Sequence, residues 1–313
     1  MKRRISQKFM KKLKFNNTTW LQVFRPKTSD LQKLKKEYGF HSITVEELKK
    51  PSIREKVERY KDYIFMVIHF PIYNQKERTV QPGELDFLLT KNTLALATIR
   101  YSKIQALKEF EQNLKNNDKL KSKSFKNPVK LLYQILSANF EFSLRQLDHI
   151  KLNIDKSEKE IYRGHERRML EEISYLTRDV VNFKRIIKFH GENLRSLEKE
   201  IVKLFGLKYR PYLESLLGQF QQVNDILEAH TETVRILHDT NQTLLSAKTN
   251  EAIKLLSIIA VFTFPLTLLA TIFGWHTRIL PIVGSQYDFW ILIGIFGAII
   301  FLMFLYFKRK KWL

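Results

Sequence analysis

Two long apolar runs dominate the pattern of hydrophobic and polar positions, and both lie near the end of the chain. Residues 255–273 and 289–307 contain no charged side chain. As α-helices they would each be about 28 Å long, close to the roughly 30 Å hydrocarbon core of a bilayer. Core helices of a soluble protein would keep a polar face, which these runs lack. The pattern therefore predicts two membrane-spanning helices joined by an extracytoplasmic loop at 274–288.

The basic residues beside the spans predict their orientation. Lys248 and Lys254 precede the first span, and the tail at 308–313 carries four more basic residues. The loop between the spans holds only Arg278 and Asp288 as charged residues. Since cytoplasmic flanks carry the excess of Lys and Arg, we expect both termini in the cytoplasm of a two-span protein of the cell membrane.

Residues 1–129 show strand and helix signals in alternation. The run at 63–70 is continuously apolar, as in a central strand buried on both faces. Lys91 and Asn92 separate two strand-like runs and predict a hairpin, and Thr44 with Glu47 resembles a capping box. The predicted elements are strands at 20–24, 63–70, 84–90 and 93–99 and helices at 26–38, 44–50 and 102–115. This part is therefore predicted to be a cytoplasmic α/β domain.

Long helices follow a polar, lysine-rich linker at 116–128. Helices at 128–162 and 166–205, separated by Gly164, predict an antiparallel hairpin within a domain at 130–210. A third helix begins near Tyr212 and continues through a stalk at 211–254 into the first span, with Pro265 as its only breaker.

The third helix carries a seam of residues at three- and four-residue spacing, which resembles a coiled coil. Its members are Leu213, Leu217, Phe220, Val223, Leu227, His230, Val234, Leu237, Asn241, Leu244 and Lys248. We expect that one chain alone does not bury this seam, and that His230 and Asn241 lie near the axis of a bundle of identical chains.

The same spacing continues into the first span. It places seven residues on one helix face: Asn250, Ile253, Leu256, Ala260, Phe264, Thr267 and Thr271. A face that mixes an amide, hydroxyls and bulky apolar groups suits a pore with a hydrophobic gate. The alternative is that the threonines donate to carbonyls of their own helix.

The segment TNEAIKLLSIIAVFTFPLTLLATIFG at 249–274, the second span and the terminal KRKKWL resemble the CorA family of divalent-cation channels and transporters. Further similarity lies in TWLQVFRP, REKVERYKDYIFMVIHFPIY and GELDFLLTKNTLALAT. The resemblance implies a funnel-shaped homopentamer whose first membrane helix lines the pore. It also implies transport of magnesium, cobalt, nickel or zinc rather than catalysis.

The pore mouth departs from the family pattern. Where the family carries Gly-Met-Asn, this chain has Gly274, Trp275 and His276. Neutral imidazole favours zinc, nickel or cobalt over magnesium, which makes His276 a candidate metal ligand. Two alternatives follow: a zinc-type relative coupled to protons, and a non-conducting structural or regulatory paralogue. Arg278 favours the second, because five arginines around the entry would repel cations.

The family resemblance also implies a regulatory site for cytoplasmic metal between the α/β domain and the stalk. Alignment of the motifs places Asp239 at the stalk position and Asn74 at the partner position. One of the two expected carboxylates is missing. A hard cation prefers several anionic oxygens, so we expect weaker closure by magnesium.

Composition adds two limits. The chain has no cysteine, which excludes disulfides and thiolate metal sites. Most of its net charge of +22 lies in residues 1–129, yet no nucleic-acid module and no catalytic constellation accompany it. We therefore expect a lipid bilayer, identical chains and divalent ions as partners, no specific nucleic acid and no cofactor. Residues 1–15 have the pattern of a short basic amphipathic helix.

Overall fold

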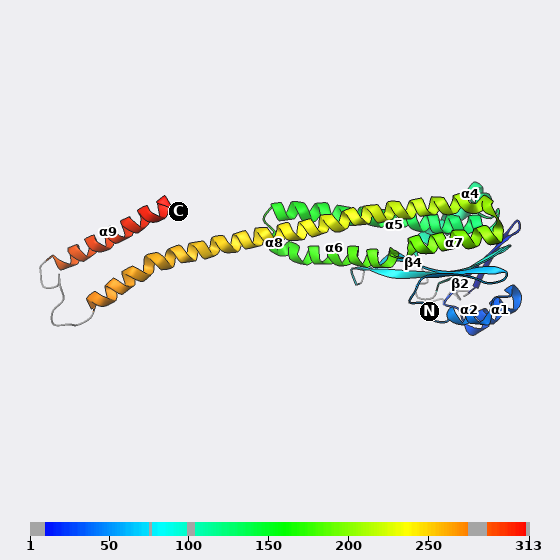
Figure 1. Cartoon of the computed structure of the whole chain (residues 1–313). Helices are drawn as coiled ribbons and strands as arrows, with labels where there is room; N and C mark the ends of the chain where they lie inside the picture. Colours follow the sequence, from blue (N-terminus) through cyan, green and yellow to red (C-terminus); the bar gives the residue numbers. More distant parts are fainter. Residues whose placement is uncertain (1–9, 75–76, 99–103, 275–286, 311–313) are drawn as a thin grey trace, which may run out of the picture. The chain divides into compact units, whose positions relative to one another are not determined.

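A computed structural model of the chain describes residues 10–74, 77–98, 104–274 and 287–310 (Figure 1). The chain forms two compact units, Met1–His238 and Asp239–Leu313. The first contains a six-stranded sheet with helices on both faces, and the second contains the two apolar helices. The helix α8 (Arg210–Gly274) begins in the first unit and ends in the second.

The sheet has the strand order β1-β2-β6-β5-β4-β3. Its strands are β1 (Met10–Phe15), β2 (Thr18–Phe24), β3 (Lys56–Arg59), β4 (Tyr63–Asn74), β5 (Thr79–Thr90) and β6 (Thr93–Thr98). Only β2 and β6 pair in parallel; the other neighbours are antiparallel. The hairpin predicted at Lys91 and Asn92 is confirmed as the β5–β6 connection. β4 is buried on both faces, as its continuous apolar run predicts, because alternate side chains enter two separate cores.

Two short helices cover one face of the sheet. α1 (Thr28–Tyr38) ends at Gly39, whose φ of 71° is in the left-handed region that glycine adopts without strain. The predicted helix at 44–50 is shifted: α2 spans Ser42–Glu47, and its N-cap is His41, whose ring nitrogen accepts from the Ile43 N–H. The Thr44 hydroxyl is hydrogen-bonded to the Tyr63 hydroxyl at 2.8 Å, so it does not form the predicted capping box.

Two predictions for the first 129 residues are corrected, and one strand was not predicted. Residues 10–15 form the edge strand β1 instead of a helix, because Leu13 and Phe15 alternate with lysines and pack against the core. The polar stretch at 116–128 contains helix α4 (Asp118–Ser124), capped by the Asn117 side chain. The strand β3, which pairs with β4, was not predicted. Helix α3 (Gln105–Asn116) begins three residues after the start of the predicted range 102–115 and ends one residue beyond it.

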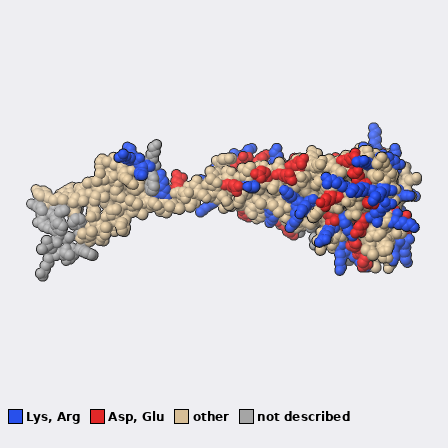
Figure 2. Space-filling model, viewed as in Figure 1, with Lys and Arg blue, Asp and Glu red and all other residues tan. Residues whose placement is uncertain are grey.

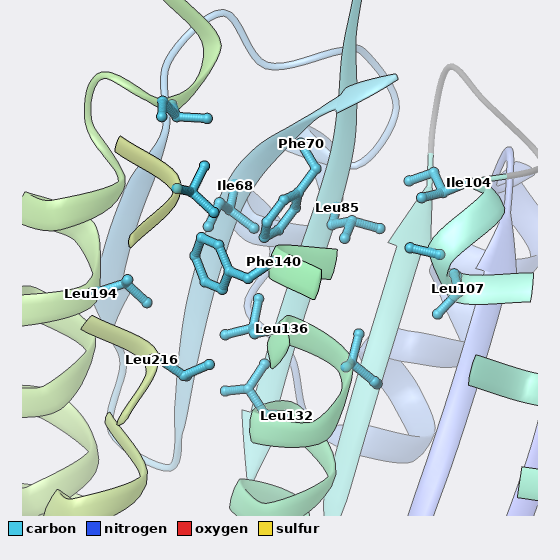
Figure 3. Packing of buried hydrophobic residues seen from close by; sticks show 14 of the residues in the cluster. Ile68, Phe70, Leu85, Ile104, Leu107, Leu132, Leu136, Phe140, Leu194 and Leu216 are labelled. Atoms are coloured by element: carbon cyan, nitrogen blue, oxygen red, sulfur yellow. The ribbon is translucent and has the colours of Figure 1, made fainter. Parts of the chain in front are cut away.

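Long helices cover the other face of the sheet. α5 (Pro128–Tyr162) agrees with its prediction, and its antiparallel partner is α6 (Glu166–Ile187). The second predicted helix is two helices, since α7 (His190–Phe205) begins after a break at Lys188 and Phe189. Figure 3 shows how α5 packs on the sheet, with the Phe70 and Phe140 rings 5.2 Å apart in an edge contact. The predicted parts 1–129 and 130–210 thus share one core within a single compact unit.

The first part of the seam on α8 is buried inside the chain itself. Leu213, Val223, Leu227 and Val234 belong to the same core as the inner faces of α5, α6 and α7. The expectation that one chain cannot bury the seam is therefore wrong for this stretch. His230 has a structural role, since its Nε2 donates to the Leu147 carbonyl at 3.2 Å. Burial lowers the pKa of His230, which keeps the imidazole neutral.

The second unit contains the end of α8 and the helix α9 (Asp288–Arg309). Both helices are long and apolar enough to cross a membrane, and their spanning windows are almost wholly exposed in the single chain. Ile258 and Phe307 are exceptions, being buried where the Phe262 and Phe307 rings lie 5.5 Å apart. The helical ranges agree with the predicted spans at 255–273 and 289–307.

Candidate functional site

The predicted pore face lies on the membrane part of α8, and its side chains are exposed among the described residues of the chain. Ile253, Leu256 and Phe264 are 54%, 66% and 71% exposed. Asn250, Ala260, Thr267 and Thr271 are exposed as well. An apolar face of this extent needs lipid or other protein to cover it. The bulky members Leu256 and Phe264 make this face the candidate for a hydrophobic constriction.

The threonines of this span do donate to their own helix. The Oγ1 atoms of Thr263, Thr267 and Thr271 lie 2.6, 2.9 and 2.9 Å from the carbonyl oxygens four residues earlier. This geometry is the alternative weighed from the sequence. It uses only the hydroxyl proton, so each oxygen keeps an acceptor lone pair. A hydroxyl bonded in this way still accepts from the water shell of a cation.

The candidate residues of the mouth are only partly described. Gly274 is the last residue of α8 and is exposed. Trp275, His276 and Arg278 lie outside the described residues.

The two aligned regulatory residues belong to different compact units. Asn74 ends β4, and its Nδ2 donates to Gln81 Oε1 at 3.3 Å. Asp239 is exposed on α8. Within the part of the chain that the structure describes, no three His, Asp or Glu side chains are grouped around a metal position. The structure thus brings no ready metal centre to either residue.

A buried polar network beside β4 was not predicted from the sequence. The Glu55 carboxylate accepts from the His69 backbone N–H at 2.7 Å and from Asn193 Nδ2 at 2.9 Å. His190 Nε2 lies 3.1 Å from Glu55 Oε1 and 2.7 Å from the His69 carbonyl, so this nitrogen carries the proton. Burial alone would raise the pKa of Glu55, but the hydrogen bonds from His190 and His69 lower it to about 2. The network fastens the segment before β3 to β4 and α7.

Two neighbouring carboxyls on β5 are also buried. Glu84 accepts from the Ser52 N–H at 2.8 Å, whereas neither oxygen of Asp86 has a hydrogen-bond donor among the described residues. Burial, and then the charge of Glu84, raise the pKa of Asp86 well above its usual range. Protonation of Asp86 would remove the repulsion between the two buried carboxylates. Sequence alone does not signal this pair, because Glu84 and Asp86 alternate as on any polar strand face.

A cavity of about 300 Å³ lies beside the β4–β5 connection. It has charges of both signs, with Arg78 paired to Glu172 at 3.4 Å and Asp179 accepting from the Val80 N–H at 3.2 Å. Burial raises the pKa of Asp179. These contacts hold the β4–β5 hairpin on α6. The acidic side chains that line the cavity are balanced by basic ones.

Taken together, these features define a class of protein: an α/β domain with long covering helices, joined by one continuous helix to two membrane spans. A comparison with family models matches residues 15–309 to the CorA family, described as CorA-like Mg2+ transporter protein. The chain belongs to the CorA family, as its sequence predicted. The family consists of ion transporters, in agreement with the expectation that the chain is not an enzyme.

The names of proteins with similar sequences agree with membership of this family. The cobalt/magnesium transport protein CorA of Thermotoga maritima is 26% identical, with 94% of this chain and 83% of the relative covered. The protein of the same name from Methanocaldococcus jannaschii is 23% identical over 94% of this chain and 91% of its own length. The solved complete structure of the M. jannaschii CorA magnesium transporter has the same fold, with a TM-score of 0.81 at 20% identity over 96% of this chain and 94% of that one. The chain is therefore a multi-pass protein of the cell membrane.

Proposed function

We propose that this protein conducts divalent metal cations across the membrane through a homopentameric, funnel-shaped pore. The proposal rests on the exposed face of α8 from Asn250 to Thr271. This face runs from the end of the predicted stalk into the first predicted span. Five copies of α8 around one axis would turn this face toward the centre, where it would line a pore. Family membership and the names of the relatives support a divalent ion as the substrate.

The proposed path begins at Gly274, Trp275 and His276, passes Thr271 and Thr267, and reaches the apolar constriction at Phe264 and Leu256. Ile253 and Asn250 form its cytoplasmic end. Threonine oxygens suit the water shell of a cation that dehydrates reluctantly, as magnesium does. Imidazoles at the mouth favour zinc, nickel or cobalt when neutral and repel every cation when protonated. We therefore propose His276 as the residue that sets ion preference.

Ion flux into proteoliposomes under an inside-negative potential tests the proposal. We expect uptake that favours zinc, nickel or cobalt over magnesium and that falls as external pH drops from about 7.5 to about 5.5, around the ordinary histidine pKa near 6.5. The variant His276→Asn should shift preference to magnesium and flatten the pH response. Uptake that requires a proton gradient would favour the zinc-type alternative. No flux of any divalent ion, with Arg278→Ser equally inactive, would leave the non-conducting alternative.

Regulation by cytoplasmic metal is a separate proposal. Asn74 supplies an amide where the family pattern expects a carboxylate, so millimolar magnesium should close this protein incompletely. Asn74→Asp should strengthen the inhibition, while Asn153→Asp, on α5 outside the aligned pair, serves as a control for added negative charge. Full inhibition of the unmodified protein would remove Asn74 and Asp239 from the regulatory site.

A further inference from the structure

A small apolar cavity lies in the first unit, between the edge of the sheet and the helices α3 and α4. Its volume is about 150 Å³, and Leu13, Phe15, Trp20, Leu114 and Phe125 form its apolar lining. The Phe125 ring centroid is 6.0 Å from that of Phe15 and 6.3 Å from that of Trp20. The cavity thus has rigid aromatic walls and accepts a compact apolar body.

Lysines border this cavity. Lys11, Lys14, Lys115 and Lys121 contribute to its lining, with Glu111 as the acidic member. Lys11 is paired with Glu111 at 2.8 Å, and Gln22 Nε2 also donates to this carboxylate. Lys121 Nζ lies 5.1 Å from the Phe15 ring centroid. Among the described residues, Lys115 and Lys121 have no carboxylate partner within ion-pair distance.

The wider surface carries both signs of charge, with an excess of basic side chains. Figure 2 shows Lys and Arg gathered around the α/β part of the chain, in agreement with the basic excess of residues 1–129. Such a field attracts anions and repels cations.

The strand β2, which contributes Trp20 to the lining of the cavity, also carries buried polar atoms. Thr18, Trp20 and Gln22 occupy one face of β2, and all three are buried. Thr18 Oγ1, Trp20 Nε1 and Gln22 Oε1 have no hydrogen-bond partner among the residues that the structure describes. Buried polar groups are normally satisfied, and the indole N–H is a donor that requires an acceptor.

We propose that this cavity binds a small organic acid, with its aryl or short alkyl body against Phe15, Trp20 and Phe125. The carboxylate lies toward Lys115 and Lys121. A cation is excluded by the lysines, and a neutral apolar molecule leaves those lysines unpaired. The site is separate from the proposed ion path, because all its residues belong to the first unit.

Titration calorimetry on the full-length protein in phosphatidylcholine nanodiscs tests this site. The probes are 3-phenylpropionate, 3-phenylpropylamine and 3-phenylpropanol, which share one body and differ in charge. We expect the acid to bind with a Kd below about 1 mM and the amine to bind at least about tenfold more weakly. Equal binding of acid and amine, or no binding of the acid, would overturn the proposal.

Two variants distinguish the site from non-specific attraction. Lys121→Gln should weaken binding of 3-phenylpropionate about tenfold, because a charge-assisted contact is lost. Lys123→Gln is the matched control, since Lys123 is exposed on the same helix α4 and does not line the cavity. Equal weakening in both variants would reduce the effect to general surface charge and reject the site.

Acidic lipids share the chemistry of the proposed ligand. The second arm of the experiment therefore repeats the titration in nanodiscs that contain phosphatidylglycerol. Unchanged binding of 3-phenylpropionate supports a soluble acid. Binding that is abolished by phosphatidylglycerol, with no effect of an added soluble anion such as sulfate, would overturn the soluble-acid proposal in favour of a lipid.

Discussion

Glu55 shows at the scale of one residue how a buried charge is made favourable. Its carboxylate is surrounded by donors from His69, His190 and Asn193, which come from a strand and a helix distant in the sequence. Hydrogen bonds to the charged form outweigh the desolvation of that form, so the pKa falls to about 2. The folded state therefore holds this proton less tightly than the unfolded chain does.

This difference predicts a pH dependence of stability. The stabilisation from Glu55 is complete above its ordinary pKa of 4.5 and is lost as pH falls toward 2. It corresponds to about 3 kcal/mol at neutral pH, which Glu55→Gln should largely remove together with the acid-side slope. Thermal unfolding of the full chain followed by circular dichroism measures both. Glu46→Gln, at an exposed position, is the control, and an equal loss in the two variants would contradict the argument.

The pH dependence of stability that comes from Asp86 has the opposite sign to that from Glu55. Its raised pKa means that its contribution is greatest at low pH and is lost as pH rises through the folded-state pKa. Asp86→Asn should remove the cost of a buried negative charge beside Glu84, so it should stabilise the protein by about 1–2 kcal/mol at pH 8 and less at pH 5. The same thermal unfolding at the two pH values tests this. A lower midpoint at both values would show that Asp86 is charged and satisfied.

At the scale of elements, α8 has two different environments along one uninterrupted helix. Its first part buries a seam inside its own chain, and its last part exposes an apolar face. The first part is buried because it shares one core with α5, α6 and α7.

Paired substitutions on α8 test which residues belong to the core. Leu227 is fully buried, whereas Ile236 is 57% exposed on the same helix. Leu227→Ala should destabilise the first unit by about 2–5 kcal/mol through lost burial and a residual cavity, and Ile236→Ala should change it by less than about 0.5 kcal/mol. Unfolding of the detergent-solubilised chain in urea provides the comparison. Similar losses of unfolding free energy in both variants would contradict burial of the seam within one chain and would favour an interface between copies.

At the scale of the whole molecule, the exposed apolar face of α8 needs lipid or other protein to cover it. The proposed homopentamer would place five copies of this face around one axis, and the detergent-solubilised complex should then have five times the 37.4 kDa mass of one chain. Native mass spectrometry after mild extraction checks this. Phe264→Ser should weaken the assembly, and Ile300→Ser on α9 is the control at a second exposed apolar position. A monomer or dimer of the unmodified chain would contradict a pore formed by five copies of α8.

Several elements were predictable because their signal is local. The uncharged runs of the spans, the Pro128 and Gly39 boundaries and the Lys91–Asn92 turn each depend on neighbours within a few residues. The family was also recognisable from the segment at 249–274 together with the upstream motifs. The strand at 10–15 and the helix α4 were missed since their polar sequences become ordered only by packing against residues such as Trp20 and Phe125.

The sequence by itself determined the two spans, the α/β pattern, the helix hairpin and the unusual mouth residues, because length, periodicity and turn chemistry act along the chain. Only the tertiary structure decided which apolar stripe is covered and which polar groups meet. Asn193 reaches Glu55 across 138 positions, and the lysine-bordered cavity joins β1, β2, α3 and α4. Such contacts depend on how separate elements pack in space, and no spacing within one element encodes them.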